Sequence, residues 1–554
     1  MNKKVCSFPI LFALLALLIG TCAVVFPASA QAAPTSTGSI TVSGTVASSY
    51  DAYQIFSANV VDGDSDAKIA TDLAWASDAV RDAALPVLHS AGMPNSQTTA
   101  REAAEWLNTD SHLTSALSAQ LARSLQSSGA KPVALNAGTT AELPCGYWLI
   151  VAKDDAIAQN EAGTAPIMAL VGGSAVTVKP KAATPKVQKH VLEDGAAAWQ
   201  KAADATVADD LYWRLSATVP AGLAAYDTYA VQFVDTMSAG LDPSKVAASV
   251  RVYVAAGADG GFDAVSANKD GRTGTEPAKG WIDITAQCRV STDGKTFTVR
   301  TGDLVAALGG ADAFTAGARV VAVYDAPLNG ACNHGIAKGN PNEVYLRYPR
   351  SPFADQSGDA GFTRTPSDDA CAYTWDLALT KRGSDGDKPL AGAVLSITDD
   401  RGRTLAADGT WDAEGKATVT TGEDGRVTVS GVDSGKLEVR ELKAPKGYTA
   451  FEGTRSVTVK AEGLDVDQVA AAKPKLTITA ESPLRADSAD GSTGSLEASL
   501  INTPTGTPPS ITTGGFMPST GDMAMYAAAA AAVAGAALIV VALLVKRGGG
   551  SHKE

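Results

Sequence analysis

The chain has 554 residues, with 46 Lys and Arg against 59 Asp and Glu and a formal net charge of −13. This length suffices for several domains, because one domain takes about 100–200 residues. The chain is acidic and has no Lys/Arg-rich run before its C-terminal tail, so nucleic acid is not expected as a partner.

The N-terminus has the three parts of a secretory signal peptide. Lys3 and Lys4 are basic, residues 8–26 are apolar, and Ala28-Ser29-Ala30 supplies small residues. We expect residues 1–30 to be removed by cleavage after Ala30, with Ala32 as a second candidate for the last residue removed. The mature protein is therefore predicted to be exported.

The cysteines that remain after this processing are Cys145, Cys288, Cys332 and Cys371. Four thiols in so long a chain do not make a disulfide framework, although export permits a bridge. We expect a disulfide between Cys288 and Cys332, since both fall in one predicted domain. Four free thiols are the alternative.

Residues 31–183 have the pattern of an α+β domain. Residues 38–46 alternate apolar with polar, as a strand does, and the leucines between 113 and 125 recur every four residues, as on one helix face. Further strands are predicted at 52–56, 146–151 and 175–178.

No metal or cofactor is expected. Asp62, Asp64 and Asp66 have the spacing that opens a calcium loop, but an EF-hand needs Gly at its sixth place and Glu at its twelfth. Ala67 and Leu73 stand there instead. A solvated turn before the next helix is the better interpretation.

Residues 184–355 contain alternating segments at 211–219, 229–234 and 344–348, which predict an antiparallel sandwich. Strand parity places Lys189 on the same face as its apolar neighbours and Asp235 on the same face as Phe233. Isolated charges buried there would be costly, and exposed positions on the strand faces are the ordinary alternative.

Residues 356–502 contain similar strands at 373–381 and 496–502. Between them, Glu438 and Glu441 lie three residues apart, so only one of them can point into a sandwich. The predicted fold is thus mainly β, with tandem sandwiches after an α+β domain.

The C-terminal part changes character twice. Residues 503–515 are rich in Pro, Thr and Gly and predict a linker. Within residues 516–554, an apolar run from Met523 to Val545 precedes Lys546-Arg547, and it is long enough for a transmembrane helix with a cytoplasmic basic flank.

The segment Met517-Pro518-Ser519-Thr520-Gly521 resembles the LPXTG sorting signal of Gram-positive surface proteins, with Met in place of Leu. The resemblance implies that sortase cuts between Thr520 and Gly521, so that the helix is present only in the precursor. A plain single-pass anchor is the alternative.

The segment 176–181 resembles the pilin motif of sortase-assembled pili. Pro180 and Lys181 fit the motif, whereas Lys179 departs from it, as does the alanine that follows Lys181. The resemblance implies that the Lys181 amine attacks the acyl-sortase of the next subunit. Lys179 and Lys186 are nearby competitors, and an ordinary basic linker is the alternative.

Segments 185–191, 233–241 and 342–348 resemble the Cna-type pilin domain that closes an internal isopeptide bond. By this resemblance Lys189 is the nucleophile, Asn342 the amide attacked and Asp235 the catalytic acid. Burial would favour the neutral amine and the protonated carboxyl that the reaction needs, and contact supplies proximity.

Residues 430–448 resemble the Cna B-type domain, whose conserved box reads Glu-Thr-x-Ala-Pro-x-Gly-Tyr, with Leu442 here in place of Thr. The resemblance implies that Lys381 attacks Asn502, with Glu441 as proton donor and shuttle. A solvated carboxylate at Glu441 is the alternative.

Together these resemblances imply a shaft subunit of a pilus on a Gram-positive cell surface, anchored to the wall and joined head-to-tail through Lys181 and Thr520. The implied partners are sortases, identical subunits, minor pilins, peptidoglycan and an extracellular host ligand. An adhesin or minor pilin that is not polymerised is the alternative. An enzyme is not expected, because the chain lacks a zinc motif and a Gly-x-Ser-x-Gly elbow.

Overall fold

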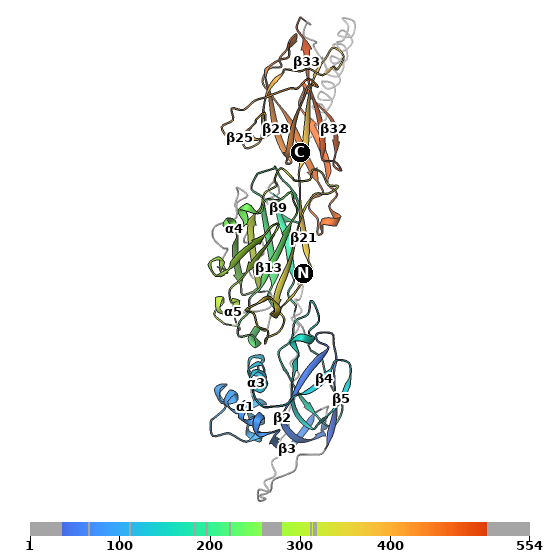
Figure 1. Ribbon diagram of the computed structural model, residues 1–554. Coiled ribbons are helices and arrows are strands. Elements are labelled where there is room, and N and C mark those ends of the chain that lie inside the picture. The colour runs from blue at the N-terminus through green and yellow to red at the C-terminus, as the bar shows by residue number, and fades with distance from the viewer. Residues whose placement is uncertain are drawn as a thin grey trace, which may run out of the picture.

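The computed structural model describes residues 36–506, apart from 65–66, 110–111, 181–183, 194–197, 221–222, 258–279, 311–312 and 314–317. Three β-rich parts follow one another along a long axis (Figure 1), which confirms a mainly β fold. The described residues contain no helix that is long and apolar enough to cross a bilayer. The signal peptide, Lys181 and everything after Gly506, including the sorting signal and the apolar run, lie outside the described residues.

The N-terminal part combines two sheets with three helices. One sheet has the order β5-β1-β8 and the other β3-β2-β6-β7, with β4 added to β2. The strands are β1 (Thr37–Val42), β2 (Ser49–Asp62), β3 (Lys68–Trp75), β4 (Val133–Asn136), β5 (Thr140–Pro144), β6 (Gly146–Ala152), β7 (Ile167–Val171) and β8 (Val176–Val178). The helices are α1 (Asp78–Ser90), α2 (Ala100–Leu107) and α3 (Ser115–Ser127).

Helix α3 begins at Ser115, two residues after the first leucine of the predicted repeat. Thr114 caps its N-terminus, because the Thr114 side chain accepts a hydrogen bond from the backbone N–H of Leu117. Leu117 and Leu121 are buried, whereas Leu113 lies before the cap and is exposed. The predicted helix face is therefore present without its first leucine.

The middle part is a sandwich of two sheets. One has the order β10-β9-β12-β18-β14-β15, and the other β11-β21-β19-β13-β17-β16 with β20 on β19. The first sheet contains β9 (Val187–Glu193), β10 (Ala198–Gln200), β12 (Tyr212–Thr218), β14 (Arg251–Ala255), β15 (Trp281–Asp283) and β18 (Arg319–Asp325). The second contains β11 (Ala202–Asp204), β13 (Gln232–Met237), β16 (Arg289–Asp293), β17 (Thr296–Arg300), β19 (Asn340–Pro349), β20 (Phe362–Arg364) and β21 (Asp368–Tyr373).

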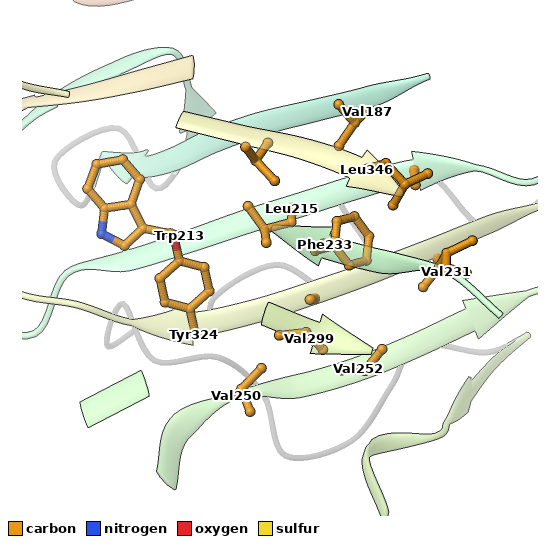
Figure 2. Close-up of a cluster of buried hydrophobic side chains, with 14 of the residues drawn as sticks. Val187, Trp213, Leu215, Val231, Phe233, Val250, Val252, Val299, Tyr324 and Leu346 are labelled. Atoms are coloured by element: carbon orange, nitrogen blue, oxygen red, sulfur yellow. The ribbon is translucent and has the colours of Figure 1, made fainter. Parts of the chain in front are cut away.

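The core of the middle sandwich lies between these sheets. Figure 2 shows Trp213 and Leu215 of β12, Phe233 of β13 and Tyr324 of β18 converging from both layers. Strand alternation explains this arrangement, because every second residue of each strand points to the inner face.

The C-terminal part is a second sandwich. Its sheets have the orders β27-β22-β33-β29, with β32 on β33, and β25-β24-β23-β28-β30-β31, with β26 on β23. The first contains β22 (Trp375–Gly383), β27 (Arg426–Val432), β29 (Tyr448–Thr449), β32 (Leu484–Asp490) and β33 (Ser495–Pro504). The second contains β23 (Val394–Thr398), β24 (Thr404–Leu405), β25 (Trp411–Asp412), β26 (Val419–Thr420), β28 (Gly435–Lys443), β30 (Thr454–Glu462) and β31 (Lys475–Ala480).

Two strands lie in a different sandwich from the one that the expected ranges indicate. Strands β20 and β21 fall within 356–502, yet both pair with β19 of the middle sandwich. Strand β19 is therefore not the last strand of that sandwich, and β11 completes the edge by pairing parallel to β21.

The junction between the two sandwiches is held by buried polar contacts. Asp204 accepts hydrogen bonds from Trp375 Nε1 (2.6 Å) and from the backbone N–H and hydroxyl of Ser434 (2.9 and 2.6 Å). At the same junction, Gly335 has a φ of 73° and packs so tightly that an added Cβ would lie 2.5 Å from the nitrogen of Gly494. A larger residue would therefore force the two sandwiches apart.

The expected disulfide is not formed, and the four described cysteines are free thiols. Cys288 directly precedes Arg289, which pairs with Arg300. Arg300 in turn pairs with Gln232, the first residue of β13, so Cys288 lies near that end of the strand. Cys332 packs against Gly240, which follows the other end of β13. The two ends lie about 16 Å apart at 3.3 Å per residue, beyond the roughly 7 Å limit between Cα atoms of a disulfide.

Candidate functional site

The structure brings Lys189, Asp235 and Asn342 together in the core of the middle sandwich. Lys189 lies on β9 of one sheet, whereas Asp235 on β13 and Asn342 on β19 are on neighbouring strands of the facing sheet. All three residues are 0% exposed. The inward direction of Lys189 and Asp235 agrees with the strand parity of their apolar neighbours.

A tyrosine hydroxyl connects these three side chains. Lys189 Nζ donates hydrogen bonds to Asp235 Oδ2 and to the Tyr324 hydroxyl, the second at 2.8 Å. The hydroxyl donates to Asp235 Oδ2 (3.0 Å) and accepts from Asn342 Nδ2 (2.8 Å). Amine, carboxyl and amide thus share one hydrogen-bonded group.

Burial shifts the protonation of the pair. Desolvation lowers the pKa of Lys189 from 10.5 to about 8, and the attraction of Asp235 opposes this only in part. Desolvation likewise raises the pKa of Asp235 above 3.8, against the attraction of Lys189. Both shifts favour the neutral amine and the protonated carboxyl.

Two oxygens of this site lack hydrogen-bond partners among the described residues, namely Asp235 Oδ1 and Asn342 Oδ1. A buried oxygen without a partner is unfavourable. A protonated Asp235 could donate to such an oxygen, so this pattern also favours the neutral acid.

Aromatic rings enclose the amine. Lys189 Nζ lies 5.3 Å from the ring centroids of Trp213 and of Tyr324. The Tyr324 ring meets Phe297 edge-on, at 4.7 Å between centroids. Figure 2 shows Trp213 and Tyr324 side by side in this space. These rings keep water away from the site.

The structure also brings together Lys381, Glu441 and Asn502 in the C-terminal sandwich. Lys381 on β22 and Asn502 on β33 belong to neighbouring parallel strands, and Glu441 reaches them from β28 of the facing sheet. The side chains of Lys381 and Glu441 are 0% exposed. Glu438, three residues before Glu441, is only half-buried.

The contacts in this second site are direct. Lys381 Nζ donates to Asn502 Oδ1 and lies 3.1 Å from Glu441 Oε1. Asn502 Nδ2 donates to the same Oε1 (2.9 Å), and the backbone N–H of Phe451 donates to Glu441 Oε2 (3.1 Å). Desolvation lowers the pKa of Lys381 from 10.5 to about 8, with attraction to Glu441 opposing it.

Each site has the three groups that an amide exchange requires. A neutral amine can attack the amide carbon, and a carboxyl group can take a proton from the amine and give one to the departing nitrogen. Close placement of amine and amide supplies the high effective concentration that this slow reaction lacks in water.

Two neighbours of the first site were not predicted from the sequence. Tyr324 belongs to none of the motifs, and residues 320–324 of its strand form a continuous apolar run that does not indicate which side chains point inward. Asp368 accepts a hydrogen bond from the backbone N–H of Lys189 (2.6 Å) and forms an ion pair with Lys201. Asp368 could not be predicted because β21 was expected outside this sandwich.

The other predicted site residues are not tested by the structure. Lys181 and the segment Met517–Gly521, with Thr520, lie outside the described residues. The competing lysines Lys179 and Lys186 are both exposed. The described residues contain no cluster of His, Cys, Asp and Glu that could hold a metal ion.

Comparison with known protein families adds to this geometry. Residues 376–473 match the prealbumin-like fold domain of SpaA. The match covers most of the C-terminal sandwich. The match includes Lys381 and Glu441 but ends before Asn502.

A curated relative is the trypsin-resistant surface T6 protein of Streptococcus pyogenes serotype M6. The two are 30% identical over 143 residues, which is 24% of this chain and 24% of the relative. The chain thus spans about a quarter of the length of the curated relative that it matches.

Solved structures of pilins resemble larger parts of the chain at low sequence identity. The T6 backbone pilin of Streptococcus pyogenes is 17% identical, with 85% of this chain and 98% of that chain covered and a TM-score of 0.46. The major pilin SpaD of Corynebacterium diphtheriae is 16% identical, with 85% and 98% covered and a TM-score of 0.39. For BcpA of Bacillus cereus the identity is 11%, the coverages 85% and 99%, and the TM-score 0.38.

Proposed function

We propose that this protein is a structural shaft subunit of a covalently polymerised pilus on a Gram-positive cell surface. The observation that carries the proposal is the pair of buried Lys, acid and Asn sets in consecutive sandwiches. Lysines are rarely buried in a core, and each of these two contacts an acid. Lys381 also contacts the Asn502 amide directly, whereas Lys189 is connected to the Asn342 amide through the Tyr324 hydroxyl. Such sites suit a protein that must withstand pulling and proteolysis.

In the proposed reaction each lysine becomes joined to its asparagine. The Lys381 ammonium gives a proton to Glu441 and its amine attacks the Asn502 side-chain carbon. The carboxyl group then gives that proton to the Asn502 nitrogen and takes a second one from the Lys381 nitrogen, and the Asn502 nitrogen leaves as ammonia. Glu441 is suited to these transfers because its Oε1 contacts both nitrogens. Lys189, Asp235 and Asn342 undergo the corresponding reaction in the middle sandwich.

Polymerisation would use two separate positions in the chain, Thr520 after the C-terminal sandwich and Lys181 between the N-terminal part and the middle sandwich. Sortase would join the carbonyl of Thr520 to the amine of Lys181 on the next subunit, and the last subunit would be transferred to peptidoglycan. A donor and an acceptor at different positions of one chain join subunits head-to-tail, and such a contact generates an open filament when it does not close into a ring. The partners are then sortases, identical subunits and minor pilins.

Intact-mass measurement of the secreted, reduced ectodomain tests the proposal. The expected mass lies below the sequence mass by two ammonia molecules, one for each bond. Tryptic peptides should join Lys189 to Asn342 and Lys381 to Asn502. A protein with its full sequence mass would overturn the proposal for both sandwiches.

A further inference from the structure

Tyr324 occupies the centre of the site in the middle sandwich. Its hydroxyl contacts Lys189 Nζ at 2.8 Å, Asn342 Nδ2 at 2.8 Å and Asp235 Oδ2 at 3.0 Å. The residue is 1% exposed, and a hydroxyl buried in an apolar core is costly unless it is hydrogen-bonded. A phenylalanine would fill the same space without that cost, so the hydroxyl needs an explanation.

We propose that Tyr324 is a catalytic residue for the Lys189–Asn342 bond, which relays the proton of Asp235 to the departing nitrogen of Asn342. The inference rests on the proposed function, because it assumes that this bond forms. It extends that function by a fourth reacting group in the middle sandwich.

The proton transfers balance as follows. The Lys189 ammonium gives a proton to Asp235, and its free electron pair forms a bond to Asn342 Cγ while the carbonyl electrons move to Oδ1. Tyr324 gives its hydroxyl proton to Asn342 Nδ2 and regains one from Asp235. The Lys189 nitrogen then loses a second proton to Asp235, the Cγ–Nδ2 bond breaks, and ammonia leaves. Asp235 ends protonated, in the form that its burial favours.

The C-terminal site explains why only one sandwich needs the relay. There, Glu441 Oε1 contacts Lys381 Nζ at 3.1 Å and Asn502 Nδ2 at 2.9 Å without an intermediary. The acid of the middle site is an aspartate, which is one methylene shorter than glutamate. The hydroxyl of Tyr324 connects this shorter carboxyl group to the amide nitrogen.

The test is the variant Tyr324→Phe in the full ectodomain, which keeps the ring that packs on Phe297. Mass spectra are taken at intervals after translation is stopped. We expect closure of the Lys189–Asn342 bond to slow about 100-fold or more, a typical contribution of general acid–base catalysis. The mass deficit of fresh protein should fall from two ammonia molecules to one. The Lys381–Asn502 bond, which should close normally, serves as a control within the same molecule.

Two further variants make the result decisive. Tyr253→Phe removes another buried hydroxyl from the neighbouring strand β14 and should leave both bonds closed. Asp235→Glu added to Tyr324→Phe provides a longer acid like Glu441 and should restore closure, which a purely structural role of the hydroxyl does not predict. Normal closure in Tyr324→Phe, or an open bond in both the single and the double variant, would overturn the relay. A wild-type chain with its full sequence mass would instead overturn the proposed function.

Discussion

Burial in the middle sandwich changes the ionisation of the Lys189 amine. Its pKa is lowered to about 8 by desolvation, whereas in an unfolded chain it would titrate near 10.5. Between these values the unfolded chain binds a proton that the folded chain does not. Folding stability should therefore rise with pH across this window and lose that contribution below about 8.

The variant Asn342→Ala makes this dependence measurable, because its lysine cannot be consumed by the bond. The reference is the double variant Lys189→Met/Asn342→Ala, which lacks the lysine. Between pH 8 and 10.5 the free energy of unfolding of Asn342→Ala should increase by up to about 3 kcal/mol more than that of the double variant. Denaturant titrations at several pH values provide the comparison. Equal slopes in the two proteins would show that Lys189 keeps its ordinary pKa.

Glu441 should be required for closure in the C-terminal sandwich. Glu441→Gln preserves the shape of the side chain but removes the group that takes up and returns protons, so the Lys381–Asn502 bond should stay open. The ectodomain should then be one ammonia heavier than wild type. Glu438→Gln, on the same strand but only half-buried, is the matched control and should leave both bonds closed. A Lys381–Asn502 peptide found in Glu441→Gln would contradict the assigned role.

At this scale the sequence predicted part of the site. Strand parity indicated that Lys189 and Asp235 point inward, and the family motifs indicated Asn342. Tyr324 could not be found in this way, since its contact with Asp235 and Asn342 depends on how β18 lies opposite β13 and β19 across the core. That relation between sheets leaves no local signal in one sequence.

At the scale of elements, the two sites connect their sandwiches differently. Lys189 and Asn342 lie on facing sheets, so a bond between them would fasten one layer to the other. Lys381 and Asn502 lie on adjacent parallel strands, β22 and β33, so a bond there would reinforce one sheet. Sequence patterns predicted the strands but not this pairing, because alternation gives a strand's inner face and not its neighbour.

The junction formed by Asp204 should keep the two sandwiches in a fixed orientation. Asp204→Ala removes the acceptor for Trp375 and Ser434, and donors left without a partner cost about 1–3 kcal/mol each. We expect a broader distribution of orientations by small-angle X-ray scattering and faster tryptic cleavage at the junction. Asp242→Ala, which removes a local turn contact to Ser244, is the control. Identical scattering from both variants would show that Asp204 does not hold the junction.

At the scale of the whole molecule, polymerisation should depend on Lys181 and on the sorting signal separately. Lys181→Ala should abolish the ladder of covalent multimers in cell-wall extracts while the monomer still reaches the wall. Lys181→Arg should behave the same way, because guanidinium stays protonated and is no nucleophile. Truncation before Met517 should instead release monomer into the medium, since it removes the acyl donor.

The controls for this experiment are Lys179→Ala and Lys186→Ala, which alter the neighbouring exposed lysines. Both should form ladders. A ladder lost in one of them but kept in Lys181→Ala would move the acceptor site. A wild-type chain that is anchored but never forms a ladder beside its own sortase would favour a single-copy adhesin.

The position of β20 and β21 after β19 has a mechanical consequence. With both bonds closed, tension passing along the chain would bypass residues 190–341 and 382–501, which would form two unloaded loops. The load would be carried in series by residues 343–380, where β21 is held by non-covalent contacts alone, among them its hydrogen bonds to β19 and β11. Under tension this stretch would extend by a limited length, because a fully extended chain spans at most about 3.6 Å per residue.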